Sequence, residues 1–205
     1  MAITLTQILA ATRIDLADDT DTSTYWEDSD LTKCANDAIR ELLNILPKHM
    51  IPYYLGSSIN DIADGDGGIT LPADFANEDA IYLDGHRARL TTPDMVDTLE
   101  ENSLLTPVYG QPIYWIVDDT LYWRPVFIFS VTSGLKIYYI KKFDELEDGD
   151  DEVQLSDGLL PIISLWTASN AKFVRESAED GKQLRNAALE RLQLLIAKKA
   201  RLDGD

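Results

Sequence analysis

The stretch EDSDLTKCANDAIRELLNILP, residues 27–47, decides how this chain folds. Its apolar residues recur three and four positions apart, which is the spacing of one face of an α-helix. These residues are Leu31, Ala35, Ala38, Leu42, Ile45 and Leu46. The acidic and hydroxyl side chains at residues 27–29 suit the first turn of a helix, and Pro47 marks its end. The sequence therefore predicts a long amphipathic helix.

Helical spacing also occurs on both sides of this stretch. Residues 3–17 predict a first helix, and the short polar side chains of residues 18–24 predict a loop after it. Near the other end, residues 159–174 and 184–195 carry two more apolar stripes. Gly181 separates these two stripes, so we expect it to mark the break between two helices.

The centre of the chain changes to the two-residue spacing of β-strands. We expect strands at residues 69–71, 81–83, 87–90, 113–117, 120–124 and 135–140. Tight connections at residues 84–86 and 118–119 predict two hairpins, and Pro93 predicts the start of a short helix. The fold class expected is α+β: a helical bundle formed by residues 1–50 and 153–205, with a small antiparallel β-rich insertion at 51–152.

Composition places the chain among globular proteins. Its 205 residues are 45% apolar and 26% charged, and such a length suggests one domain with an insertion. No run approaches the roughly 18 apolar residues of a membrane span, and residues 1–15 lack the cationic start of a signal peptide. Cys34 is the single cysteine, which excludes an internal disulfide framework and suits a reducing compartment.

The net charge of −18 is unevenly distributed. Residues 182–205 hold six basic and three acidic residues, a net of +3, so residues 1–181 carry −21. The acidic part argues against gripping nucleic acid, because phosphate contacts need clustered lysine and arginine. Residues 144–152 contain seven acidic residues in nine positions, which predicts an exposed, extended loop.

Catalytic and metal-binding motifs are not evident. His49 and His86 have no partner at the spacing of a zinc site, and Cys34 lies beside an apolar helical stripe. The aspartate-rich stretches that begin at Asp64 and Asp148 do not fit the EF-hand frame. We therefore predict no catalytic residue, no metal and no cofactor, and we expect no enzymatic activity.

Aromatic residues occur as neighbouring pairs at 53–54, 114–115, 122–123 and 138–139. Neighbours in a strand face opposite sides, so one member of each pair should point inward. The outward members are able to stack on bases, but few cations lie between them, so cross-strand packing or a protein interface fits better.

The order of these segments resembles the bacteriophage head-to-tail adaptor (connector) proteins. The resemblance spans nearly the whole chain and rests on five short motifs taken in order, not on any single one. They are Tyr25-Trp26 with Leu31, the helix from Asn36 to Leu46-Pro47, Leu71-Pro72-Ala73-Asp74-Phe75, Pro112 to Ile116 with Leu121 to Pro125, and Ile137 to Lys142. The pair Cys34-Ala35 departs from the pattern, because such proteins tend to have an aromatic–aliphatic pair there.

The resemblance implies a structural protein at the head–tail junction of a virion. It implies a ring, dodecameric on a dodecameric portal, with the portal protein, a tail or nozzle protein and further copies of itself as partners. DNA would be only passing cargo, and no membrane is involved. The basic carboxyl-terminal helix is our candidate for docking on the portal, through Lys182, Arg185, Arg191, Leu192, Leu195, Lys198, Lys199 and Arg201. A helix with a merely solvated basic face is the alternative.

Two other functions stay open at this point. The aspartate clusters also suit a small metal-dependent phage hydrolase or nuclease, and the net charge of −18 suits an acidic inhibitor that mimics DNA.

Overall fold

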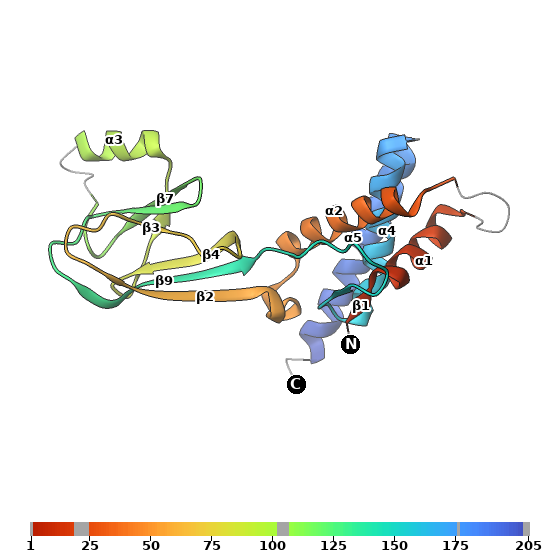
Figure 1. Ribbon diagram of the computed structural model, residues 1–205, viewed down its shortest axis with the longest axis horizontal. Coiled ribbons are helices and arrows are strands. Elements are labelled where there is room, and N and C mark those ends of the chain that lie inside the picture. Colours follow the sequence, from red (N-terminus) through yellow and green to blue (C-terminus); the bar gives the residue numbers. More distant parts are fainter. Residues whose placement is uncertain (1, 19–24, 102–106, 176, 203–205) are drawn as a thin grey trace. The chain divides into compact units, whose positions relative to one another are not determined.

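The computed structural model describes residues 2–18, 25–101, 107–175 and 177–202. The chain divides into two units, coloured along the sequence in Figure 1. The helical unit consists of Met1–Tyr53 and Phe143–Asp205, and the β unit of Tyr54–Lys142. Helices and largely antiparallel sheets are both present, as the sequence predicts.

The described residues of the helical unit form four long helices. They are α1 (Leu5–Leu16), α2 (Asp28–Ile45), α4 (Leu160–Arg175) and α5 (Ala178–Leu202), and α4 packs against each of the other three. The helix α4 is buried on most sides, and its Ile163, Ala168 and Ala171 are fully buried, as expected for a helix with neighbours on several faces. Residues 19–24 of the predicted loop after the first helix lie outside the described residues.

The acidic segment 144–152 is held more firmly than the sequence predicts. Its carboxylate side chains are mostly exposed, but Leu146 is buried and exchanges two 3.0 Å hydrogen bonds with the Asn36 amide on α2. The backbone N–H groups of Leu5 and Thr6 donate to the carbonyl groups of Asp151 and Gly149, at 2.9 and 3.0 Å. These carbonyls satisfy donors that the first turn of a helix otherwise leaves unpaired, so the segment is anchored to the helical unit.

A two-stranded pairing completes this anchor. Strand β1 (Ile3–Thr4) lies antiparallel to β10 (Glu152–Val153), next to the start of α1. Three short 3₁₀ turns occur elsewhere, η1 (Lys48–Met50), η2 (Pro52–Tyr54) and η3 (Asp157–Leu159). The order of helices and strands in the sequence suggests an insertion over residues 51–152, and in the structure the chain from Phe143 onward clusters with the helices.

Gly181 does not separate the last two helices. The helix α5 begins at Ala178, so Gly181 lies within its first turn. A Cβ atom at Gly181 would come 3.0 Å from the Phe173 ring on α4, tighter than nearly all real contacts. The glycine therefore allows a close approach between α4 and α5 and is not a helix break.

The part of the β unit that the structure describes forms two four-stranded sheets, where the sequence predicts one small sheet. Their strand orders are β2-β9-β4-β5 and β3-β8-β7-β6. The strands are β2 (Leu55–Ile62), β3 (Gly68–Thr70), β4 (Phe75–Leu83), β5 (His86–Arg87), β6 (Arg89–Leu90), β7 (Ile113–Val117), β8 (Thr120–Arg124) and β9 (Val131–Lys141). Strand β2 was not expected, because it has few β-branched residues, and its pairing with β9 defines it.

One pair of strands is parallel, against the antiparallel prediction. Strands β6 and β7 run in the same direction because the chain between them passes through the helix α3 (Pro93–Glu101). A parallel pair needs such a crossover, whereas a hairpin turn produces an antiparallel pair.

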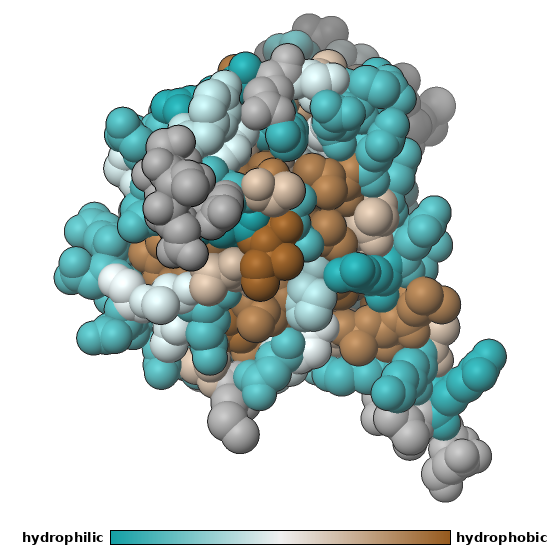
Figure 2. All heavy atoms as spheres, turned by 90° about the vertical axis from the view of Figure 1, so that its right-hand side faces the viewer, coloured by the Kyte–Doolittle hydropathy of each residue, from teal (hydrophilic) through white to brown (hydrophobic). Residues whose placement is uncertain are grey.

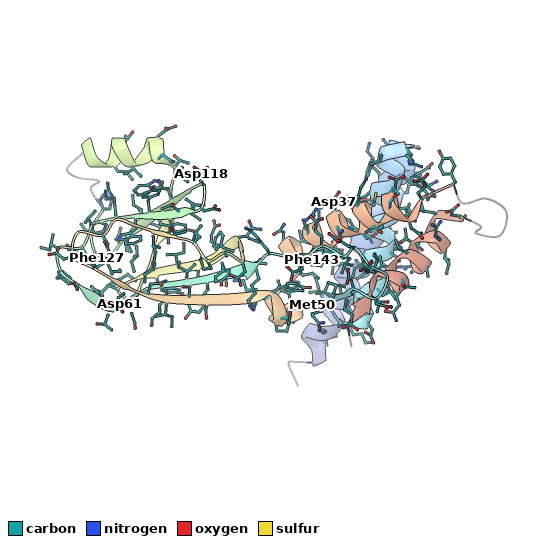
Figure 3. The ribbon with its side chains drawn as sticks, viewed as in Figure 1. Asp37, Met50, Asp61, Asp118, Phe127 and Phe143 are labelled. Carbon is teal, nitrogen blue, oxygen red and sulfur yellow. The ribbon has the colours of Figure 1, made fainter. Side chains whose placement is uncertain are left out.

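The core of the β unit lies between its sheets and is rich in aromatic rings. Phe127, labelled in Figure 3, is fully buried, and Trp123 is 2% exposed. Ile81 and Leu83 from β4 and Leu121 from β8 pack into the same cluster. Burial of such side chains stabilises each by about 1.5–3 kcal/mol.

Candidate docking surface

The candidate docking residues occupy different sides of α5. Leu192 is 4% exposed and belongs to the core, and Leu195 and Lys199 are half-buried. Lys182, Arg191, Lys198 and Arg201 are exposed. The structure therefore brings together only part of the predicted set on an accessible face.

Arg185 is used inside the helical unit. Its guanidinium lies 4.2 Å from the centre of the Trp166 ring and donates to the Asn170 side-chain oxygen at 2.6 Å. It also forms an ion pair with Glu41 on α2, which accepts a 2.9 Å hydrogen bond from the Trp166 indole. Arg185 therefore joins α2, α4 and α5, a role that its position in the sequence does not reveal.

The pKa of Glu41 reflects this network. Partial burial of the carboxylate alone would raise its pKa, but hydrogen bonds from Arg185 and Trp166 and the Arg185 charge outweigh burial. The pKa of Glu41 is therefore lowered, which keeps the carboxylate ionised for its two partners.

An exposed strip runs along the second half of α5. Arg191, Leu194, Lys198 and Arg201 follow one another three or four positions apart, so they share one side of the helix. Leu194 is 71% exposed and was not among the predicted residues, although its spacing from the cations could have shown it. Lys182 is nine residues before Arg191, two and a half turns, and so lies on the opposite side. We call Arg191, Leu194, Lys198 and Arg201 the basic strip.

Exposed apolar side chains also occur elsewhere on the helical unit. Figure 2 shows apolar side chains gathered among polar ones on one face of the molecule. The helical unit exposes Ile14 on α1, at 80%, and Val174 at the end of α4, at 76%. Tyr25 and Phe173 are also substantially exposed. Single exposed apolar side chains are common on protein surfaces, so these four residues do not by themselves define a docking surface.

The chain matches one protein-family model along nearly its full length. That model, described as SU10 adaptor protein, matches residues 3–204. The chain belongs to the SU10 adaptor protein family. The match confirms the resemblance to phage head-to-tail adaptor proteins that the order of the segments indicates. A search among curated proteins finds no significant match.

Family membership assigns the chain a phage adaptor role, with a place in the virion and association with other head and tail proteins. It favours a structural role over an enzymatic one. Among the described residues of this SU10 adaptor, no helix is both long and apolar enough to cross a membrane.

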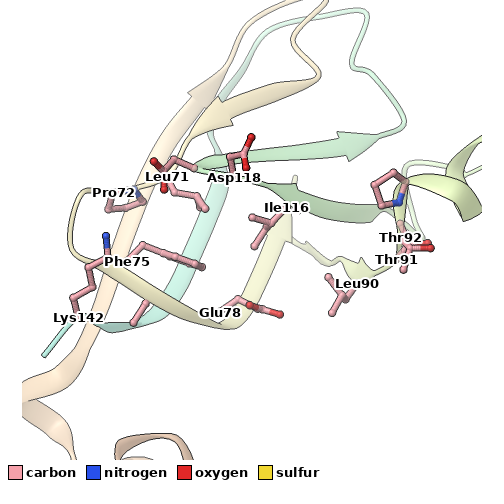
Figure 4. Close-up of a pocket in the computed structure, with 13 residues that line it drawn as sticks. Leu71, Pro72, Phe75, Glu78, Leu90, Thr91, Thr92, Ile116, Asp118 and Lys142 are labelled. Carbon is pink, nitrogen blue, oxygen red and sulfur yellow. The ribbon is translucent and has the colours of Figure 1, made fainter. Parts of the chain in front are cut away.

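The adaptor carries an open groove within its β unit, shown in Figure 4. The groove has a volume of about 520 Å³. Its apolar lining includes Phe75 and Ile116, and its charged lining includes Glu78, Asp118 and Lys142. Polar and apolar groups share the lining about equally, and three of its four charged residues are acidic.

Groups with catalytic or metal-binding chemistry are dispersed in the adaptor. His49 and His86 are exposed in different units. In the described ranges, no three His, Cys, Asp or Glu side chains are grouped closely enough to hold a metal ion. Burial raises the pKa of the Cys34 thiol, and the neighbouring Asp37 and Asp30 raise it further. The thiol is therefore kept protonated and weakly nucleophilic.

The aromatic pairs of the adaptor alternate as predicted. Tyr54, Tyr114, Trp123 and Tyr139 are the buried members of the four pairs. Among the outward members, Trp115 stacks on Tyr122 of the paired strand, with ring centres 5.7 Å apart. Tyr138 meets Tyr82 edge to face at 6.0 Å. Three of the outward rings therefore serve cross-strand packing.

Proposed function

We propose that this SU10 adaptor is a noncatalytic structural protein of a tailed-phage virion. In this proposal, copies of the chain form a ring at the head–tail junction, between the portal and a tail or nozzle protein, and leave a channel for DNA. The family match over residues 3–204 is the observation that carries the proposal. A dodecamer is the ring size proposed for a dodecameric portal.

We assign a separate role to each of the two units. The helical unit is proposed as a bundle that docks on the portal, and the β-rich insertion as a separate domain that contacts neighbours. Heterologous contacts between identical subunits close into rings, which is the symmetry this role requires. The net charge of −18 supports the proposed DNA channel, because an acidic channel wall repels phosphates and lets DNA pass without binding.

The basic strip is the portal-docking surface in this proposal. Arg191, Lys198 and Arg201 supply positive charge, and Leu194 supplies an apolar contact between them. Arg185 and Leu192 support docking indirectly, because they hold α5 on the rest of the helical unit. Lys182, Leu195 and Lys199 border the strip or lie beyond it and contribute less.

Charge reversal of the basic strip tests this proposal. The variant Arg191→Glu/Lys198→Glu/Arg201→Glu keeps the buried face of α5, so its circular dichroism should match the parent chain. We expect at least a tenfold weaker association with isolated portal rings, measured by sedimentation, because three attractive charges become repulsive. The Lys182→Glu variant is the control and should bind within about twofold of the parent.

Portal binding that survives the triple reversal would exclude the basic strip as the docking surface. Absence of the chain from purified virions would exclude the adaptor role altogether. Cleavage of DNA by the purified chain in the presence of Mg²⁺ would favour the nuclease alternative.

A further inference from the structure

Two arginines of the β unit stand apart from the others. Arg87 ends β5 and Arg89 begins β6, with the buried Ala88 between them. Both arginine side chains are exposed, and neither forms an ion pair or a side-chain hydrogen bond with any residue in the described ranges. The chain has twice as many acidic as basic residues, so most of its cations have carboxylates available to them. Two neighbouring arginines without an ion pair are therefore candidates for binding an anion.

The backbone holds these arginines in place. Arg87 pairs with Tyr82 in one sheet, and the Arg89 N–H donates to the Pro112 carbonyl beside the other sheet, at 3.0 Å. The Ala88 N–H donates to the Ile81 carbonyl at 2.8 Å. Since the chain passes from one sheet to the other at Ala88, both guanidinium groups start from fixed points, and binding costs less backbone entropy.

A pocket of about 410 Å³ lies beside the two arginines. Arg87 and Arg89 line it together with apolar groups of Ile81, Leu90 and the buried Tyr114. A guanidinium near apolar surface is more weakly hydrated than one in open water, so it binds a carboxylate more strongly there. We call this pocket the arginine pocket.

The acidic segment 144–152 has the complementary chemistry. Asp144, Glu147, Asp148 and Asp150 are exposed, and none has a cationic partner among the described residues. Their backbone is pre-organised, because Asp151 accepts the N–H groups of Glu147 and Asp148 at 2.7 and 2.8 Å. The Thr6 hydroxyl donates to the Gly149 carbonyl at 2.8 Å and fixes the turn to α1.

We propose that the arginine pocket of one copy of the chain binds the acidic segment 144–152 of a neighbouring copy. The contact joins two different surfaces of the same protein, so it is heterologous and is compatible with a closed ring. It rests on the ring proposed above and names the surfaces that join its subunits. Both surfaces are fixed before they meet, so few rotatable bonds are lost beyond the carboxylate and guanidinium side chains.

Nucleic acid is the less favoured occupant of the arginine pocket. Phosphate binding draws on many clustered cations, and here two arginines stand on a β unit with 13 acidic and 6 basic residues, a net of −7. The acidic segment instead supplies seven carboxylates in nine positions, the highest local density in the chain.

A charge-swap series in purified virions and in solution tests the contact. Arg87→Glu/Arg89→Glu should lower self-association at low salt about tenfold or more, by sedimentation velocity, and should deplete the chain from virions. Asp148→Arg/Asp150→Arg should do the same. The chain that carries all four substitutions should regain association, because each attractive pair is restored with its charges exchanged.

A matched control separates local contact from net charge. Lys33→Glu/Lys136→Glu changes the net charge by the same amount as the arginine variant, but neither lysine lines the arginine pocket. This control should associate within about twofold of the parent. Far-ultraviolet circular dichroism verifies that each variant is folded.

A cysteine pair gives a second, direct readout. In a Cys34→Ser background, Arg89→Cys and Asp148→Cys should form an intermolecular disulfide when intact virions are treated with a mild thiol oxidant such as diamide, which takes up the two electrons and two protons. The product is seen as a ladder on a non-reducing gel. Particles that contain the chain but show neither the charge-swap rescue nor this cross-link overturn the arginine-pocket contact and leave the adaptor role standing. Loss of DNA binding in Arg87→Glu/Arg89→Glu with unchanged self-association overturns it in favour of phosphate. Particles without the chain overturn the adaptor role itself.

Discussion

The two units of the chain use their charges and rings in opposite ways. In the helical unit, Arg13, Arg40, Arg175 and Arg185 each bind at least one carboxylate of another segment. In the β unit, Arg87 and Arg89 bind none among the described residues, and aromatic rings fill the core instead. The helical unit therefore gains cohesion from charge pairing as well as from its apolar stripes. The β unit depends on close packing and leaves Arg87 and Arg89 available to other molecules, whereas its Arg124 lies over the Trp115 ring.

The largest expected effect comes from the core of the β unit. Trp123→Ala removes a nearly fully buried indole, so we expect the free energy of unfolding of the β unit to fall by about 3–5 kcal/mol. Urea unfolding with ¹⁹F-labelled tryptophan checks this, because Trp115 reports on the β unit and Trp26 and Trp166 on the helical unit. Equal shifts of all three signals would erase the distinction between the units.

A glycine tests how tightly the β unit is packed. A Cβ atom at Gly56 would lie 2.5 Å from the Tyr139 ring, which is buried and donates a 2.9 Å hydrogen bond to Asp74. Because the ring has little room to move, Gly56→Ala should lower the free energy of unfolding by about 1–3 kcal/mol. Gly110→Ala, where nothing lies within 4 Å, is the matched control and should change it little.

The corresponding test of charge pairing in the helical unit is Arg185→Ala. It removes the Trp166 and Asn170 contacts and leaves Glu41 without its cation, so we expect a loss of about 1–3 kcal/mol. The Trp166 ¹⁹F signal should report the earlier unfolding. Arg191→Ala, on the exposed side of the same helix, should cost less than 0.5 kcal/mol as a rough upper bound. Similar costs at both positions would contradict the role assigned to Arg185.

The smallest predicted effect is a loss of stability at alkaline pH. It should act on the β unit. Burial raises the pKa of Tyr114 to about 12, with a further push from Glu78 that the Arg87 charge opposes. A raised pKa in the folded state means that stability is intact below pH 10 and is lost as the pH rises from 10 to 12. At pH 11 the loss is about 1.4 kcal/mol. Tyr114→Phe should reduce this slope in a pH series of urea titrations, and the buried Tyr139, whose pKa is raised by burial and by Asp74, should account for part of what is left. The exposed Tyr122→Phe should keep the full slope.

The helices were predictable because their information is local. The spacing of Leu31, Ala35, Ala38 and Leu42 reports one buried face, and the structure buries all four. The strand β2 was missed because Gly56, Ser57, Ser58 and Asn60 have no strand preference of their own. Its extended form depends on pairing with β9, about 75 residues away in sequence, and such pairing leaves little local signal.

The candidate surface was partly predictable for the same reason. The cations of the basic strip are visible in the sequence, and helical spacing assigns them a face. The internal ion pair of Arg185 could not be predicted, because its partner Glu41 is 144 residues away in the sequence. The turn that the Asp151 carboxylate holds could not be predicted either. Charge repulsion predicts an extended loop, and it does not indicate that backbone carbonyls of this segment cap α1.

The capping of α1 by the carbonyls of Gly149 and Asp151 affects how the protein folds during its synthesis. The first turn of α1 finds acceptors on Gly149 and Asp151, which are synthesised more than 140 residues later. At about 5–20 residues per second, translation separates the two by roughly 7 to 29 seconds. During that interval the nascent β unit emerges complete while the earliest helix still lacks its closing partner. We therefore expect protease-resistant nascent chains to contain the β unit first, with the amino terminus protected only near the end of synthesis.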